Sequence, residues 1–113
     1  MGKPHEQLEA WKFAMQLVKA VYQIASDFPV EQRYGLAQQM RRAAVSIPSN
    51  IAEGAGRNGA KEFLTFIGIS RGSLAEFEIQ LQLAGMLGFA LPDPSAFELT
   101  NSTGKLLTGL HKK

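Results

Sequence analysis

Four polar residues in the middle of the chain, Arg42, Ser46, Ser49 and Glu53, are separated by steps of four, three and four positions. This spacing aligns them along one side of an α-helix. An arginine, two hydroxyls and a carboxylate could bind and process a phosphate group. However, Arg42 and Glu53 would lie about 16 Å apart on a straight helix. The stripe also holds no histidine, lysine or second carboxylate to activate a serine. We therefore expect no catalytic residues and a protein that is not an enzyme.

A packing role is the stronger interpretation of the same segment, because a proline interrupts its helical pattern. Pro48 removes the hydrogen bond to the Ala44 carbonyl and crowds that carbonyl, which costs about 3 kcal/mol. The apolar spacing continues past the proline, so we expect a kink there. The alternative is a true interruption, with Asn50 capping a new turn. The candidate structural motif comprises Ser46, Pro48, Ser49, Asn50, Glu53, Gly54, Gly68 and Gly72.

The register between this helix and the next follows if the chain folds back near residue 57. Ser46 would then face Gly68, and Ser49 would face Thr65, so small residues would meet around the proline. Close backbone approach would follow, and hydroxyl or amide side chains there could satisfy carbonyls freed by the proline.

Basic residues are concentrated in the middle of the chain, although the net charge is only +2. Residues 33–72 hold six basic and two acidic residues, a net charge of +4, which leaves −2 for the rest. The predicted register places Arg42 near Arg71, and this like-charged pair would need an acid such as Glu76, an anion or another subunit. These arginines could grip phosphate oxygens or form ion pairs within or between subunits. The candidate nucleic-acid-binding residues are Arg41, Arg42, Arg57, Lys61 and Arg71.

Alternating steps of three and four between apolar residues predict four amphipathic helices. They cover about residues 5–26, a segment that begins near Glu31, about residues 59–87 and about residues 95–111. Asn58 and Asp93 are the expected N-caps of the third and fourth helices. Four such helices with short loops and no strand pattern predict an all-α, antiparallel up-down-up-down bundle that forms one domain, residues 1–113.

Each predicted helix carries a stripe that should face the core. In the first helix the stripe is Leu8, Trp11, Met15, Val18, Tyr22 and Ala25, widened by Ala14, Leu17, Val21 and Phe28. The other stripes are Leu36, Met40, Ala43, Ile47 and Ile51; Phe63, Ile67, Ser70, Leu74, Phe77, Leu81 and Ala84; and Leu99, Leu106 and Leu110 with Phe97. Tyr34 is the aromatic residue expected at the surface. Phe13, Ile24, Phe66 and Ile79 exceed what one core needs, which predicts a homo-oligomer.

The composition excludes several classes of protein. There are no cysteines and only two histidines, so we expect no disulfide, metal or cofactor. No apolar run is long enough to span a membrane, and the N-terminus lacks the apolar region of a signal peptide. We expect a cytoplasmic protein.

The chain resembles the four-helix bundle proteins encoded in intervening sequences of bacterial 23S ribosomal RNA genes. The residues that carry the resemblance are Trp11, Val21-Tyr22, Phe28-Pro29, Tyr34-Gly35-Leu36, residues 39–43, residues 46–54, Phe63 and residues 71–76. The resemblance implies assembly as a homopentamer, and a relative in diversity-generating retroelements is a basic nucleic-acid-binding accessory to a reverse transcriptase. RNA, DNA or a nucleic-acid-processing protein is therefore an expected partner. The alternative is a protein–protein scaffold that binds no nucleic acid.

Overall fold

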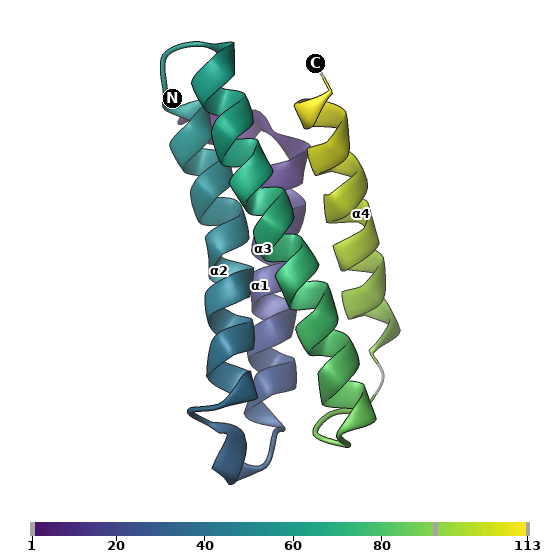
Figure 1. The fold of residues 1–113 in the computed structure, drawn as a ribbon. Helices are drawn as coiled ribbons and strands as arrows, with labels where there is room; N and C mark the ends of the chain where they lie inside the picture. The colour runs from purple at the N-terminus through teal and green to yellow at the C-terminus, as the bar shows by residue number, and fades with distance from the viewer. Residues whose placement is uncertain (1, 92, 113) are drawn as a thin grey trace.

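The computed structural model describes residues 2–91 and 93–112, and over these residues it is helical with no strand. Four α-helices follow one another along the chain (Figure 1): α1 Glu9–Ser26, α2 Leu36–Ala55, α3 Ala60–Met86 and α4 Pro94–His111. Two short 3-10 helices, η1 Pro4–Gln7 and η2 Val30–Gln32, precede α1 and α2. The prediction of four helices is confirmed.

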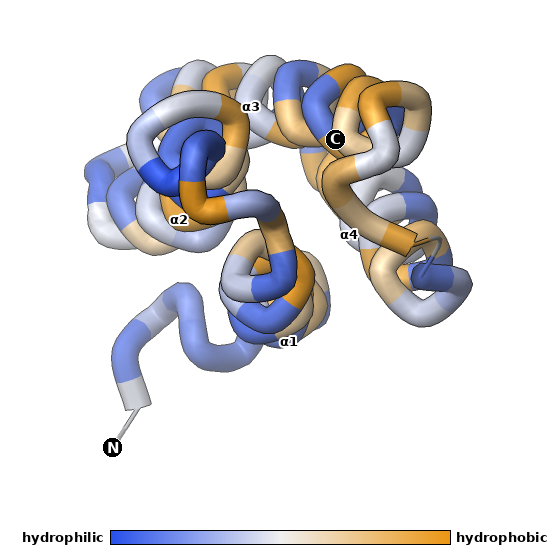
Figure 2. The backbone as a smooth tube through the Cα atoms, turned by 90° about the horizontal axis from the view of Figure 1, so that it is seen from below, coloured by the Kyte–Doolittle hydropathy of each residue, from blue (hydrophilic) through white to orange (hydrophobic). Residues whose placement is uncertain are grey.

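The helices lie side by side in an elongated bundle with extents of 44 × 24 × 22 Å. Helix α2 packs against α1 and α3, and α4 packs against the same two helices from the other side. The view along the bundle in Figure 2 shows the four helices around a common centre. The most extensive contact is between α2 and α3.

The start of α2 was predicted wrongly. The segment near Glu31 forms only the 3-10 helix η2, and α2 begins at Leu36. Gly35, at φ −108° and ψ −120°, separates the two elements with a non-helical backbone. The side chain of Gln32 then accepts a hydrogen bond from the Leu36 amide at 3.4 Å. Tyr34, in the same turn, is exposed as predicted.

The two predicted N-caps have opposite outcomes. Asp93 caps α4, because its carboxylate accepts hydrogen bonds from the amides of Ser95 and Ala96. The hydrogen bond from the Ser95 hydroxyl is the main reason that the pKa of Asp93 lies below its ordinary value of 3.8. Asn58 does not cap α3. Gly59 holds that position with φ +100°, a left-handed conformation that glycine adopts without a steric penalty.

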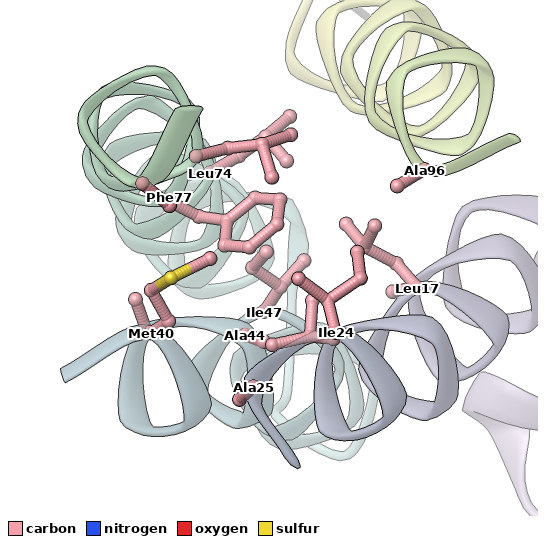
Figure 3. Close-up of a cluster of buried hydrophobic side chains, with 14 of the residues drawn as sticks. Leu17, Ile24, Ala25, Met40, Ala44, Ile47, Leu74, Phe77 and Ala96 are labelled. Carbon is pink, nitrogen blue, oxygen red and sulfur yellow. The ribbon is translucent and has the colours of Figure 1, made fainter. Parts of the chain in front are cut away.

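The predicted core is confirmed for α2 and α3 and wrong for parts of α1 and α4. All core residues predicted for α2 are buried except Leu36. All those predicted for α3 are buried except Phe63. Figure 3 shows this cluster, in which Phe77 and Leu74 of α3 lie near Met40, Ala44 and Ile47 of α2.

In α1 the core side is the second apolar set rather than the predicted stripe. The buried residues are Ala10, Ala14, Leu17, Val21, Ile24 and Ala25. Met15 and Tyr22 are 46% and 47% exposed. Small alanines allow α1 to approach its neighbours closely, and the bulkier stripe is thereby left at the margin. Ile24, predicted to be surplus, belongs to the core.

In α4 the buried stripe is shifted by one residue from the prediction. It consists of Ala96, Thr100, Thr103 and Leu107, whereas Leu99, Leu106 and Leu110 are only partly buried and Phe97 is 44% exposed. The threonine hydroxyls donate to the Ala96 and Leu99 carbonyls at 2.7 Å, so their polar groups are satisfied within the helix. Threonine can therefore occupy core positions that the hydrophobic pattern assigns to leucine.

Candidate nucleic-acid interface

The polar segment of α2 contacts α3 closely because Gly54 has no side chain. A Cβ atom at Gly54 would lie 2.8 Å from Cβ of Phe66 and 3.2 Å from the Phe63 carbonyl oxygen. Real Cβ atoms almost never come so close to other atoms. The backbones of α2 and α3 therefore approach each other at Gly54, near the last turn of α2.

The polar side chains around Pro48 form hydrogen bonds within the protein. Ser49 donates to the Val45 carbonyl at 2.7 Å, and the Asn50 amide donates to the Ser46 carbonyl at 2.8 Å. Both acceptors lie close to the proline. Neither is the Ala44 carbonyl, which lacks its usual helical hydrogen bond because Pro48 has no amide N–H. Helix α2 is continuous from residue 36 to 55, so the alternative of an interruption at Pro48 is wrong.

The register of α2 against α3 differs from the prediction by about one helical turn. Ser46 Oγ lies 2.8 Å from Ser73 Oγ, not opposite Gly68. The buried Ser70 donates to the Ile47 carbonyl at 2.9 Å. The close approach at Gly54, which lies against Phe63 and Phe66, belongs to the same shifted register.

Two glycines of the predicted motif do not lie between α2 and α3. A Cβ at Gly68 would meet only His111 Nε2, at 3.8 Å, so this glycine faces the end of α4. A Cβ at Gly72 would meet nothing within 4 Å. Their predicted role in close packing against α2 is therefore wrong.

The predicted basic residues are spread over several faces of the bundle. Arg41 lies over the ring of Tyr22 on α1, with its Cζ 5.4 Å from the ring centroid. Arg57 pairs with Glu53 at 2.7 Å and lies over the Phe66 ring at 5.0 Å. Lys61 is exposed in the first turn of α3. These residues do not form one compact patch.

The remaining two arginines line separate grooves. Arg42 lines a groove of about 370 Å³ between α2 and α3, together with Glu76, Ser46 and Ser73. Arg71 instead lies against α4, where its Nη1 is 3.1 Å from His111 Nδ1. The like-charged cluster of Arg42 and Arg71 that the predicted register required is therefore not formed.

Arg71 belongs to a larger basic groove between α3 and α4, which we call the α3–α4 groove. It has a volume of about 590 Å³, and its cationic lining residues are Arg71, Lys105 and Lys112. Over the described part of the chain, no carboxylate lies within 4.0 Å of these three cations. Glu78 is the acidic residue among the lining residues. A guanidinium group can only donate hydrogen bonds, so in the contact with Arg71 the Nδ1 atom of His111 must be the acceptor.

Sequence reasoning missed Lys105 and Lys112, although a signal was present. Asn101, Lys105, Thr108 and Lys112 follow one another at steps of four, three and four, and all four line the groove. This is the same kind of stripe as the one that drew attention to Arg42. The predicted basic surface covered only residues 33–72, a range that excludes both lysines.

The described residues contain no group of three or more metal-binding side chains, and no described helix is long and apolar enough to cross a membrane. The fold and its surfaces thus define a small four-helix bundle with a basic groove, in which Ser46, Ser49, Ser70 and Ser73 of α2 and α3 are engaged in internal hydrogen bonds.

A family model described as 23S rRNA-intervening sequence protein matches residues 6–110, and the chain belongs to this family. No curated protein matches the chain.

Proposed function

We propose that this chain is a non-enzymatic, homo-oligomeric bundle protein that binds RNA or DNA, alone or in a nucleoprotein partner, through a basic surface. The α3–α4 groove is the observation that carries the proposal. Three cations line it, over the described residues none of them has a carboxylate within ion-pair distance, and Thr108 and Asn101 add hydrogen-bonding groups. A groove of this kind suits the phosphate backbone, which proteins contact through arginine, lysine and small polar side chains.

Three further features complete the proposal. The helices run up-down-up-down, in keeping with Figure 1, where the α2–α3 loop lies at the opposite end of the bundle from the other two loops. Helix α2 bends at Pro48, because the ring crowds the preceding turn. The assembly is a pentamer, as the family resemblance implies. A nucleic-acid ligand agrees with the cytoplasmic location expected from the sequence.

The proposal is tested by titrating fluorescent single-stranded RNA and duplex DNA at 50 and 200 mM salt. We expect affinity to fall steeply with salt, because each phosphate contact releases counterions. Lys105→Ala and Arg71→Ala should each weaken binding and reduce the salt slope by about 0.7 for single strands or 0.9 for duplex DNA.

Lys12→Ala is the matched control, because Lys12 is an exposed cation on α1 that pairs with Glu9 at 3.0 Å. It should leave the slope unchanged. Arg41→Ala and Arg42→Ala test the surface predicted from sequence against the groove. Binding that is absent or insensitive to salt would contradict the proposal.

The alternative function is a protein–protein scaffold, and it is favoured by exposed apolar side chains. Met15 and Val45 are 46% and 40% exposed, and both line an apolar groove between α1 and α2. This alternative would be favoured if the protein formed a stable oligomer but bound nucleic acid only at background level and without dependence on salt.

A further inference from the structure

Helix α3 carries a second heptad stripe on the side that faces away from the core. Its members follow one another at steps of three and four over more than three heptads, and all of them are exposed. We call this stripe the α3 outer seam: Glu62, Thr65, Ile69, Gly72, Glu76, Ile79, Leu83 and Met86. Such spacing is typical of a helix packed against another helix. Within the described chain no element buries the seam, although its member Glu76 also lines the groove between α2 and α3 that holds Arg42.

The apolar members of the seam are large and strongly exposed. Ile79 is 56% exposed, Met86 is 82% exposed, and Ile69 and Leu83 are 46% and 39% exposed. A helix that is apolar on two opposite sides normally has both sides covered. The bundle core covers one side of α3, so the seam is expected to meet a partner.

A complementary surface lies on a different side of the bundle. The α1–α2 groove has a volume of about 340 Å³ and an almost entirely apolar lining: Trp11, Met15, Val18, Val45, Pro48, Ser49 and Ala52. Over the described residues no Cα atom of α1 lies within 8 Å of one of α3, and the groove and the seam share no residue, so they are separate surfaces. Figure 2 shows α1 and α3 on opposite sides of the bundle centre.

The charges beside the two surfaces are opposite. Lys19 is exposed and, on the helical wheel of α1, lies next to Met15, as does Lys12, whose charge is paired with Glu9 at 3.0 Å. Arg41 lies over Tyr22 at the same margin. The seam instead contains Glu62 and Glu76. Over the described residues neither of these glutamates has a cation within 4.0 Å.

We infer that the α3 outer seam of one copy docks into the α1–α2 groove of a second copy. This inference rests on the homo-oligomeric part of the proposed function and names the two surfaces that would meet. Pairing groove with groove would oppose lysine to lysine, and pairing seam with seam would oppose glutamate to glutamate, whereas pairing groove with seam brings opposite charges together.

The contact is therefore head-to-tail: each copy offers a seam to one neighbour and a groove to another. A head-to-tail contact closes into a ring if the rotation between copies allows it. The surfaces also match in length. The seam extends about 36 Å along α3 and α1 is about 27 Å long, at 1.5 Å per residue, so the two helices can lie side by side.

Light scattering combined with size-exclusion chromatography tests the inference at micromolar concentration. Ile79→Lys in the seam and Met15→Lys in the groove should each shift the wild-type oligomer to the mass of a single chain, with an unchanged helical circular dichroism spectrum. Val30→Lys is the matched control, since Val30 is 67% exposed and lies in η2, outside both surfaces. It should retain the oligomer.

Cross-linking then tests which surfaces meet, because the chain contains no cysteine. Val45→Cys and Ile79→Cys proteins are mixed and treated with a short bifunctional thiol reagent. Mixed dimers should form in large excess over dimers of either variant alone. An oligomer that survives both lysine substitutions, or that yields only same-variant dimers, would overturn this inference and leave the proposed homo-oligomer intact. A wild-type monomer would overturn both.

Discussion

The α2–α3 contact and the α3–α4 groove both contain polar side chains, but they use them differently. Between α2 and α3 the serines bond to one another or to backbone carbonyls, as Ser70 does to Ile47. Between α3 and α4 the cations line an open groove, and Arg71 reaches only the imidazole of His111. Polar groups that are satisfied internally hold the bundle together, whereas the groove cations, which have no carboxylate within 4.0 Å over the described residues, form the surface that we propose for ligand binding. The substitutions below should therefore affect stability at the α2–α3 contact far more than around the groove.

The largest effect on stability is expected at Gly54. Gly54→Ala places a Cβ 2.8 Å from Cβ of Phe66, which belongs to a stiff part of that side chain and cannot swing away. Overpacking of this kind costs about 1–3 kcal/mol, more than the roughly 1 kcal/mol that alanine gains over glycine in a helix. We expect Gly54→Ala to lower the free energy of unfolding measured by urea denaturation.

The control for this substitution is Gly85→Ala in α3, where a Cβ would meet nothing within 4 Å. Here the helix-propensity gain should dominate, and the free energy of unfolding should rise by about 0.5–1 kcal/mol. Equal stability of the two variants would show that α2 and α3 do not approach closely at Gly54.

An intermediate effect is expected at Ser70, which is fully buried. Ser70→Ala removes the hydrogen bond to the Ile47 carbonyl and should lower the free energy of unfolding by about 1 kcal/mol. Ser26→Ala is a matched control, because Ser26 donates a bond of similar length, 2.7 Å, to the Gln23 carbonyl at an exposed site. Its effect should remain within about 0.5 kcal/mol. A loss at Ser26 as large as that at Ser70 would mean that burial does not distinguish the two bonds.

The sequence predicted the four helices and the cores of α2 and α3, because the core stripes of those helices are regularly spaced, and the second stripe of α3 is interrupted by Glu62, Thr65 and Glu76. It failed on α1, where two apolar stripes compete, and spacing does not reveal that the alanine-rich one packs inside. It also failed on α4, where Thr100 and Thr103 are buried. A threonine whose hydroxyl bonds within its own helix behaves as a core residue, and hydropathy does not register this.

The candidate site was less predictable than the fold, because it depends on the register between helices. A shift of about one turn separated Arg42 from Arg71 and brought Ser46 to Ser73. The position of Arg71 beside Lys105 and Lys112 depends on how α4 packs on α3. Residues about 40 positions apart in the sequence carry no local pattern that reveals this proximity.

The smallest effect is expected at Asp93, which caps the helix that forms one wall of the α3–α4 groove. Asp93→Ala removes hydrogen bonds from the amides of Ser95 and Ala96 and should lower the free energy of unfolding by about 0.5 kcal/mol at pH 7, the low end of the range for a helix cap, because Asp93 lies at an exposed helix end. The pKa of Asp93 is lower in the folded than in the unfolded chain, because the hydrogen bond from the Ser95 hydroxyl and, to a smaller extent, the two amide bonds favour the charged carboxylate. Its contribution to stability is therefore present above the unfolded value of about 3.8 and is lost as the pH falls through the lower folded value.

Urea denaturation between pH 2 and 7 measures this contribution, and the difference between wild type and Asp93→Ala should shrink at the acid end. Asp93→Asn is the informative control, since asparagine caps helices nearly as well but carries no charge. It should keep most of the stability at pH 7 without the acid-dependent loss that belongs to Asp93. If removing the cap also weakened nucleic-acid binding, the wall of the groove would depend on the cap. We expect binding to be unchanged, because Lys105 and Lys112 lie more than three turns from the capped end, in the part of α4 held by Thr103 and Leu107.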